Sequence, residues 1–490
     1  MNPPIPEALP DDSRCGGTIT DWLEHSAMGH PHAPALLDRQ DGTSHAQLRH
    51  RIGALVHRLS RCGVERGVLA VASHSACLLT LLVHATPRLG CALLPLDPAL
   101  PRATLLAMLE QTGARFLITE TFDAPFAIEV IEAATLLASL EENVPDSPPG
   151  LPVMPLAPDE VHLIVATSGS EGEPKGAMLT GRNLAVSAQA ARERLGLVAR
   201  DCWLDCLPLH HIGGLAILYR CACAGAAVLH VDRFDAAVVW DLLRRHPVTH
   251  LSLVPVMLSR LLEACAVPPP PTLRRVLIGG AALPSKLAQR ALELGWPLCA
   301  SYGLTEAGSQ VATLCNLPAG WTGGLVGCPL RGMEVRIDEG CGRIHIRGGA
   351  VMAGYANPAL TPGLGLAPDG WFETADLGRL DAEGRLWVLG RADDVIVTGG
   401  VNVHPRQVEE LLADCPGITE VAVTGRPDPA WGARLVAVLA GSAEPAQVEA
   451  WCRSHLSGAL RPREFMKISE LPRNAVGKLD RHRLRSLVLG

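Results

Sequence analysis

Hydroxyl, glycine and lysine side chains gather in one short stretch of this 490-residue chain, directly after an apolar run from Val161 to Ala166. The apolar run is typical of a buried strand, and an alanine-rich helix is expected from Asn183. The residues in between that could hold an anion are Thr167, Ser168, Gly169, Ser170, Gly172 and Lys175. Glycines let backbone N–H groups approach an anion, hydroxyls donate to its oxygens, and lysine adds a positive charge. The stretch predicts a phosphate-binding loop, although a flexible surface loop can have the same composition.

This loop differs from the Walker A loop of P-loop NTPases, because Pro174 replaces the glycine before the lysine and Gly176 replaces the following Ser or Thr. Further polar motifs follow it in the order Ser301–Glu306 (SYGLTE), Thr374–Asp376, Gly390–Asp394 and Pro472–Lys478. Together the motifs resemble the adenylate-forming superfamily of acyl- and aryl-CoA synthetases, peptide-synthetase adenylation domains and luciferases. The resemblance covers nearly the whole chain, from about Thr18 to Leu487.

The resemblance implies an enzyme that activates a carboxylate with ATP. Transfer of AMP to the carboxylate expels pyrophosphate, and a thiol such as CoA then displaces AMP. Charge neutralisation and in-line positioning dominate the catalysis of the first step. The implied cofactors are ATP, Mg²⁺ and CoA, with Glu306 and Thr167 placed at the metal.

By the same resemblance, most of the matched residues bind nucleotide or CoA. Tyr302 is expected to lie on adenine, Asp376 and Arg391 to reach the ribose, and Thr305 to donate to the α-phosphate. The remaining matched positions, after the phosphate loop, are the strand-end turn Gly279, Gly280 and Ala281 and the pantetheine-tunnel residues Gly399 and Gly400. The chain departs from the family pattern at Glu171, where Thr is usual, and at Val397, where Lys is frequent.

The implied catalytic residues are Lys478, Thr305, Glu306 and His211. Lys478 matches the lysine that enters the site for adenylation. Asp393 matches the hinge about which the C-terminal domain turns between the two half-reactions. His211 ends an expected strand near the acyl pocket, where it either touches the carboxylate or packs as a structural residue.

The segments Ser301–Leu314, Val397–Pro405 and Leu471–Ala475 look most like those of 2-succinylbenzoate–CoA ligases of menaquinone synthesis. The expected acyl pocket (207–215, 278–283 and 309–313) is apolar and contains no arginine that clearly offers to bind a second carboxylate. Three alternatives therefore stay open: another acyl-CoA synthetase, an adenylation enzyme that loads a separate carrier protein, and a degenerate homologue that binds nucleotide without turnover.

The pattern of strands and helices predicts the α/β class. Strands alternate with helices up to about Ala300, which predicts parallel sheets with crossover helices, and short strands with glycine turns follow from Gly323 and suggest a small β-barrel-like part. We expect a large AMP-binding domain at residues 1–390 and a smaller, mobile α+β domain at residues 391–490.

Composition restricts the partners. A net charge of −7 without a basic block argues against nucleic acid, and the most apolar stretch, from Val68 to Leu96, is too interrupted for a membrane span. The fifteen cysteines lack metal spacing and are interpreted as small buried hydrophobes of a cytoplasmic protein. The sequence leaves the oligomeric state open and is compatible with a homodimer.

Overall fold

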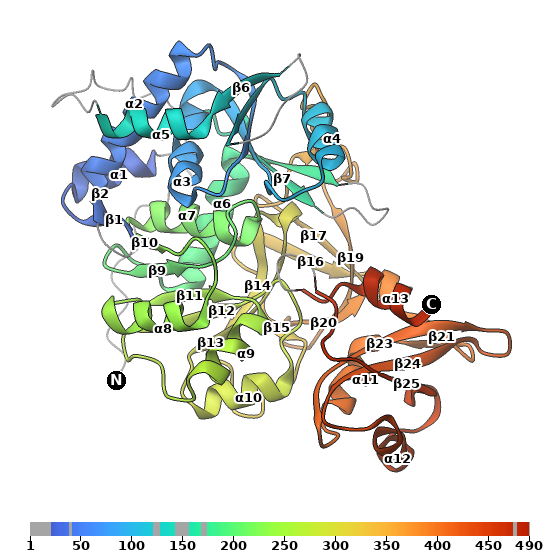
Figure 1. The fold of residues 1–490 in the computed structure, drawn as a ribbon. Helices are drawn as coiled ribbons and strands as arrows, with labels where there is room; N and C mark the ends of the chain where they lie inside the picture. Colours follow the sequence, from blue (N-terminus) through green and yellow to red (C-terminus); the bar gives the residue numbers. More distant parts are fainter. Residues whose placement is uncertain are drawn as a thin grey trace.

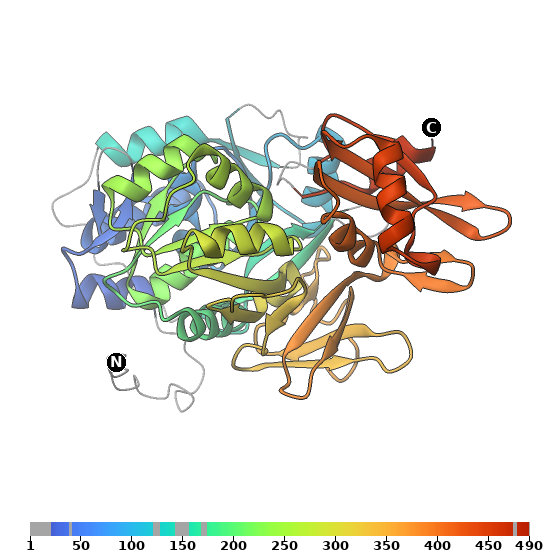
Figure 2. The ribbon, with the colours of Figure 1, turned by 90° about the horizontal axis from the view of Figure 1, so that it is seen from below.

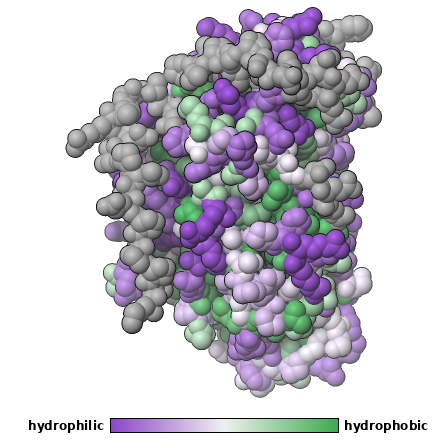
Figure 3. Space-filling view, turned by 90° about the vertical axis from the view of Figure 1, so that its left-hand side faces the viewer, coloured by the Kyte–Doolittle hydropathy of each residue, from purple (hydrophilic) through white to green (hydrophobic). Residues whose placement is uncertain are grey.

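The computed structural model describes residues 21–38, 42–120, 128–142, 156–167, 174–473 and 478–489. A large body extends from α1 to β20, and a smaller part from β21 to α13 lies beside it near β20 (Figure 1; seen from below in Figure 2). In the described part of the chain, none of the helices combines the length and apolar character needed to cross a bilayer. Hydrophilic and hydrophobic residues are mixed over the face shown in Figure 3.

One sheet of the large body has the strand order β18-β8-β7-β4-β3-β5-β6. Its strands are β3 (Gly67–Ala72), β4 (Cys91–Pro95), β5 (Phe116–Thr119), β6 (Glu129–Glu132), β7 (Val161–Thr167), β8 (Lys175–Thr180) and β18 (Gly354–Tyr355). β3 and β4 are continuous apolar runs, as expected of parallel strands that are covered on both faces. β8 pairs antiparallel with β7, so the two strands lead into and out of the predicted phosphate loop.

A second sheet has the order β14-β13-β12-β11-β9-β10-β1-β2. It contains β1 (Pro34–Leu37), β2 (Gly42–Ser44), β9 (Cys202–Asp205), β10 (Ala227–His230), β11 (His250–Leu253), β12 (Arg275–Ile278), β13 (Leu298–Leu304) and β14 (Ser309–Cys315). The strands from β10 to β13 are parallel to their neighbours, whereas β14 returns antiparallel to β13. The carboxyl ends of β9, β12 and β13 consequently lie along one edge of the sheet.

The helices form layers on both sides of these sheets. They are α1 (Trp22–Gly29), α2 (His45–Arg61), α3 (Ala76–Ala85), α4 (Arg102–Thr112), α5 (Ala133–Glu142), α6 (Gly181–Leu195), α7 (Ile212–Ala224), α8 (Ala236–Arg245), α9 (Pro255–Ala264) and α10 (Ser285–Glu293). Apolar residues of α2, α3, α6 and α7 share one core with strands of both sheets, so these helices fill the space between them. α8, α9 and α10 cover the other face of the second sheet, and α4 covers the other face of the first.

An antiparallel sheet follows, with the order β15-β20-β19-β17-β16, and it is the expected small β part of the large domain. Its strands are β15 (Leu325–Gly327), β16 (Met333–Ile337), β17 (Arg343–Gly348), β19 (Phe372–Leu380) and β20 (Leu386–Arg391). β20 ends at Arg391, and the short 3-10 turn η4 (Ala392–Asp394) leads from it into the C-terminal part.

The C-terminal part is the expected α+β unit. It contains the hairpin β21 (Ile396–Thr398) and β22 (Val401–Val403), the sheet β23 (Ile418–Asp428), β24 (Gly432–Gly441) and β25 (Glu464–Lys467), and the helices α11 (Pro405–Leu412), α12 (Pro445–His455) and α13 (Arg481–Leu489). Its own core packs α11 and α12 against β23 and β24, and Leu484 and Val488 of α13 pack on the other face. The observed architecture confirms the predicted fold class.

Local departures from the predicted elements occur where an element is short or polar. The predicted helix does not follow the phosphate-loop residues directly, because the strand β8 precedes α6. α6 begins at Gly181, where Thr180 and Asn183 form a capping box. α1 begins at Trp22, after the N-cap Asp21, whose side chain accepts from the Glu24 backbone N–H.

Candidate active site

The candidate site lies where strand ends of the second sheet meet the antiparallel sheet and the start of α13. Tyr302 lies near the end of the strand β13, and Thr305 and Glu306 belong to the 3-10 turn η3 (Thr305–Ala307) between β13 and β14. Asp376 belongs to β19 and Arg391 to β20. Residues distant in sequence are thus brought together by the ends of neighbouring elements.

A hydrogen-bonded group forms around Asp376. The Tyr302 hydroxyl donates to Oδ2 of Asp376 at 2.8 Å, and Thr374 Oγ1 accepts from the Asp376 backbone N–H at 3.1 Å. Burial raises the pKa of Asp376, and the Tyr302 hydrogen bond and the charge of Arg391 oppose that rise. Asp376 and Arg391 are paired residues of β19 and β20. The group offers a carboxylate and a guanidinium side by side, as hydrogen-bonding to a sugar diol requires.

Lys478 reaches this group from the C-terminal part. A Cβ placed on Gly280 would lie 3.2 Å from the Lys478 Cε and 3.7 Å from its Nζ, so the lysine side chain runs along the glycine. Gly280 has φ of +75°, which also favours glycine at this turn. Burial lowers the pKa of Lys478, the charge of Asp376 raises it, and Arg391 lowers it. The structure therefore brings together Gly280, Asp376, Arg391 and Lys478, four of the residues that the sequence analysis named.

The segment after β9 places two histidines next to this lysine. The rings of His210 and His211 are 4.4 Å apart between centroids, and His210 Nε2 lies 3.7 Å from Asp97 Oδ2. Burial lowers the pKa of His211 to about 4, with smaller contributions from the nearby charges of His210 and Lys478. His211 is thus a neutral imidazole near the lysine, able to contact a bound carboxylate without adding charge.

The predicted metal residue Glu306 is held in place by Tyr355. The Tyr355 hydroxyl donates to Glu306 Oε1 at 2.8 Å, and the Lys175 Nζ lies 5.6 Å from the centre of the Tyr355 ring. Thr167 pairs with Lys175 across β7 and β8, and its hydroxyl donates to the Lys175 carbonyl at 3.1 Å. Among the described residues no group of three or more His, Cys, Asp or Glu side chains could hold a metal. One carboxylate is nevertheless suited to a Mg²⁺ ion that phosphate oxygens and waters also coordinate.

Some predicted residues stand apart from this arrangement. Ser168, Gly169, Ser170 and Gly172 lie outside the described residues. Gly399 and Gly400 form the turn between β21 and β22, and Figures 1 and 2 both place that hairpin at the outer edge of the C-terminal part, away from β13. The Gly399 N–H donates to the carbonyl of Trp431 at 2.9 Å. Gly279 and Ala281 flank Gly280 at the end of β12.

Sequence reasoning missed two residues. Tyr355 is one of three tyrosines in the chain, but no motif marks it. Arg220 lies in the apolar helix α7, is 2% exposed, and donates from Nη2 to Ser309 Oγ at 2.8 Å at the start of β14. Within the described residues it makes no ion pair, its Nε has no hydrogen-bond partner, and burial lowers its pKa to about 10. The predicted acyl segments themselves contain no arginine, and Arg220 reaches Ser309, at the start of one of them, from the neighbouring helix α7.

Comparison with known proteins identifies the class of protein. The AMP-binding enzyme family model matches residues 23–356, and the AMP-binding enzyme C-terminal domain matches residues 407–478. The chain belongs to the AMP-binding enzyme family, which confirms the resemblance inferred from the motifs.

Particular relatives match over nearly their full length. The chain is 33% identical to the 2-succinylbenzoate–CoA ligase of Bacillus cereus (strain ATCC 10987) over 96% of this chain and 99% of that protein. It is 34% identical to the same-named ligase of Bacillus velezensis, over 96% and 98%. A solved structure of o-succinylbenzoate CoA synthetase from Bacillus subtilis, in complex with the acyl-adenylate intermediate, superposes with a TM-score of 0.83 at 30% identity, covering 95% of this chain and 98% of that one. Another structure of that synthetase, with ATP and magnesium ion, has a TM-score of 0.84.

Proposed function

We propose that this protein is an ATP-dependent carboxylate–CoA ligase that forms an acyl-adenylate and then a thioester. The observation that carries the proposal is the position of Lys478, which lies against Gly280 and within electrostatic reach of Asp376, Arg391 and His211. An ammonium group at this place favours the negative charge that develops as the carboxylate attacks the α-phosphate of ATP. This position supports a role of Lys478 in adenylation.

The surrounding residues take the roles that their chemistry allows. Asp376 and Arg391 bind the ribose hydroxyls, and the Tyr302 ring, fixed by its hydroxyl, borders the adenine. Glu306 binds Mg²⁺ together with the phosphates, and Thr167 and Lys175 stand at the two ends of the loop that cradles the pyrophosphate. The magnesium ion supplies charge neutralisation when it is bound. His211 contacts the carboxylate as a neutral donor or acceptor.

For the substrate we propose an aromatic dicarboxylate such as 2-succinylbenzoate, the acid in the names of the relatives. That molecule has two carboxylates, of which only one is activated, so the other needs a charged partner inside the protein. Arg220 is a buried guanidinium with a free Nε, held beside Ser309 just beyond η3. A buried cation without a counter-ion is costly unless a ligand neutralises it. We assign the ring carboxylate to Arg220 and the chain carboxylate to Lys478.

The second half-reaction needs a different face of the C-terminal part at the same site. We propose a large domain of residues 1–390, a mobile domain of residues 391–490, and a rotation at Asp393 that exchanges Lys478 for the turn of Gly399 and Gly400. These glycines are exposed in the present arrangement, and a Cβ on Gly400 would meet nothing within 4 Å, so Gly400 leaves room for a narrow thiol arm of CoA. The polar segment η4 at the end of β20 is suited to such a hinge because it is short and the Asp393 side chain is exposed.

The test is pyrophosphate release with ATP and Mg²⁺ across 2-succinylbenzoate, benzoates, and medium- and long-chain fatty acids, each with and without CoA. The proposal expects CoA-dependent turnover of 2-succinylbenzoate, with formation of AMP and the CoA thioester. Turnover of a fatty acid instead would replace the substrate and keep the reaction. Adenylation that CoA does not accelerate would indicate a carrier-protein thiol. Absence of both turnover and ATP binding would refute the proposal.

A further inference from the structure

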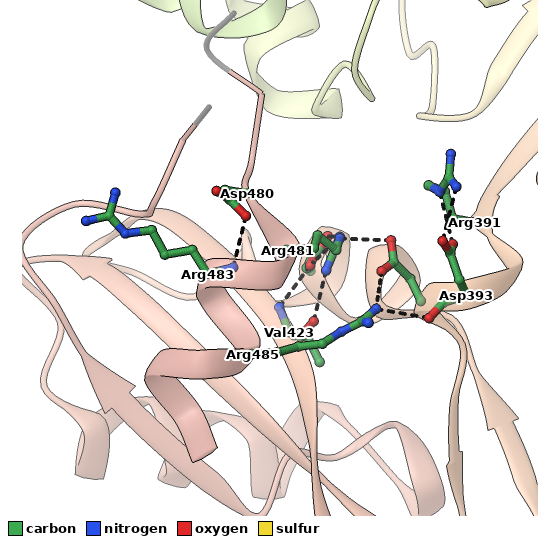
Figure 4. Close-up of polar contacts among 9 residues, drawn as sticks. Arg391, Asp393, Val423, Asp480, Arg481, Arg483 and Arg485 are labelled. Carbon is green, nitrogen blue, oxygen red and sulfur yellow. Dashed lines mark hydrogen bonds and ion pairs between the residues drawn. The ribbon is translucent and has the colours of Figure 1, made fainter. Parts of the chain in front are cut away.

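The helix that follows Lys478 is tied directly to the hinge. α13 begins three residues after the lysine, and Figure 4 shows two of its arginines, Arg481 and Arg485, pointing toward the segment that joins β20 to the C-terminal part. Arg483, on the same helix, points away from that segment. The contacts of these side chains define which part of the hinge moves with which domain.

Arg481 anchors α13 within the C-terminal part. Its Nη2 donates to both carboxylate oxygens of Glu409 in α11, at 3.0 and 3.2 Å, and its Nη1 donates to the Val423 carbonyl at 3.0 Å. Its Nε also lies 3.1 Å from Asp394 Oδ2. The side chains of Asp394 and Arg481 are only 12% and 25% exposed. Asp394 is therefore fastened to the body of the C-terminal part.

Arg485 extends this anchoring to the hinge peptide itself. Its Nη2 donates to the backbone carbonyl of Asp393 at 2.9 Å and to Asp394 Oδ1 at 2.6 Å. The Asp393 side chain is held from the opposite side, because Arg391 of β20 donates to its two oxygens at 2.9 and 3.1 Å. The carbonyl of Asp393 and the peptide to Asp394 thus belong to the C-terminal body, and the side chain of Asp393 belongs to the large body.

We propose that Arg485 is a positioning residue that confines the domain rotation to the backbone bonds of Asp393. This inference rests on the proposed two-step reaction. With the 393–394 peptide fixed to α13 and the Asp393 side chain held by Arg391, the Cα–C bond of Asp393 is the main swivel, and the contacts of Arg481 and Arg485 resist turning at Asp394. Lys478 lies three residues before the first residue of this helix, so the position of α13 restricts the position of the lysine. Without Arg485 the chain gains freedom at Asp394, and Lys478 samples a wider range of positions.

The test compares Arg485→Gln with Arg483→Gln, which removes the same charge from the same helix. Hydrogen exchange is measured for a peptide covering residues 392–397, and the adenylation half-reaction is measured as acyl-adenylate formed from 2-succinylbenzoate and ATP. Arg485→Gln is expected to speed exchange at the hinge by roughly three- to tenfold and to slow adenylation by a similar factor, as the loss of partly exposed charge-assisted hydrogen bonds would. Exchange in β23, β24 and α11 and the apparent KM for ATP are expected to stay unchanged, and Arg483→Gln is expected to resemble the wild type.

Three outcomes separate the inference from its alternatives. Equal hinge exchange in both variants would overturn it, and faster exchange throughout the C-terminal part would show that Arg485 merely stabilises the domain. Arg485→Lys keeps a donor for one of the two oxygens and is expected to restore part of the hinge protection. Hinge exchange that responds as expected in a protein with no ligase activity would refute the proposed function and leave the mechanical role of Arg485 standing.

Discussion

Replacing Arg220 by methionine should make the protein more stable and a poorer enzyme. Burial lowers the pKa of Arg220 from its ordinary value to about 10, so the side chain stays protonated at pH 7 and the folded protein bears the full free-energy cost of burying its charge. That difference corresponds to about 3 kcal/mol of destabilisation. Methionine removes this cost. It also removes the hydrogen bond to Ser309 and the cation–π contact with the Trp203 ring, whose centre lies 5.6 Å from the guanidinium, and these two interactions together stabilise the fold by about 2 kcal/mol. The free energy of unfolding should therefore rise by about 1 kcal/mol.

Although Arg220→Met should raise the free energy of unfolding, it should lower the catalytic efficiency. Loss of a buried charge that pairs with a substrate carboxylate costs about 3–5 kcal/mol, so kcat/KM for 2-succinylbenzoate should fall by roughly 10²- to 10⁴-fold. The matched substrate is 4-oxo-4-phenylbutanoate, which has the same chain but no ring carboxylate. The wild type should prefer 2-succinylbenzoate by a similar factor, whereas Arg220→Met should treat the two acids within about tenfold of each other. Arg220→Lys should retain part of the preference, because it keeps the charge but loses the planar fork.

The assay is steady-state pyrophosphate release for both acids, together with urea unfolding followed by tryptophan fluorescence. An Arg220→Met protein that unfolds at a lower urea concentration than the wild type, and loses activity equally toward both acids, would refute the reasoning, because a purely structural arginine gives that result. Unchanged preference for the dicarboxylate in a stable Arg220→Met protein would refute the assignment of the second carboxylate.

Further predictions concern the nucleotide site, the turn beside Lys478 and the response to acid. Tyr302→Phe removes the hydrogen bond that holds Asp376, and steady-state kinetics should show a roughly five- to tenfold higher KM for ATP with kcat little changed; a lower kcat at constant KM would contradict this. Gly280→Ala forces a side chain onto a residue with φ of +75° and into the space beside Lys478, so single-turnover adenylation should slow by at least about tenfold while CoA attack on supplied acyl-adenylate is retained. Burial lowers the pKa of several histidines to about 4, whereas the same side chains have a pKa of about 6.5 in the unfolded chain. The free energy of unfolding therefore has its full value above about pH 6.5 and decreases as the pH falls toward 4. At pH 5.5 each of these histidines lowers the free energy of unfolding by about 1.4 kcal/mol, which amounts to about 7 kcal/mol for all of them. Circular dichroism should therefore show unfolding between about pH 6 and 5. A native signal at pH 4.5 would contradict the burial of these rings. They are His84, His162, His211, His230 and His250.

Sequence reasoning predicted what short contiguous patterns encode. Thr305, Glu306, Asp376 and Arg391 were recognisable because each belongs to a short motif that resembles the pattern of the family. The alternation of apolar strands and amphipathic helices was enough to predict the fold class. Most cysteines of the described chain are buried or partly buried, as expected, although Cys62 and Cys341 are exposed.

The missed elements had weak local signals. β8 (KGAMLT) adjoins the phosphate loop and begins with lysine and glycine, so its polar start conceals a strand that is otherwise buried. β14 follows a 3-10 turn with no apolar alternation to announce it. α13 is rich in arginine, and only Leu484 and Val488, spaced four residues apart, are buried. In each case pairing with a distant strand or packing on β24 decides the structure, and the local sequence does not.

The missed contacts of the site depend on long-range packing. Ser309 lies 89 residues beyond Arg220, and Asp376 lies 74 residues beyond Tyr302. No spacing rule connects such pairs. A single arginine inside the apolar run of α7 was the available signal, because a charged residue surrounded by Leu, Ile and Cys is rarely buried without a purpose.

The most direct test of the account is to separate the two half-reactions in Lys478→Ala. Acyl-adenylate formation from 2-succinylbenzoate and ATP is measured in one experiment, and thioester formation from supplied acyl-adenylate and CoA in the other. The account predicts that Lys478→Ala loses adenylation by at least about 10²-fold, as removal of one group that stabilises transition-state charge does, and keeps thioester formation near the wild-type rate. Equal loss of both half-reactions in a folded protein, or full adenylation without the lysine, would contradict it.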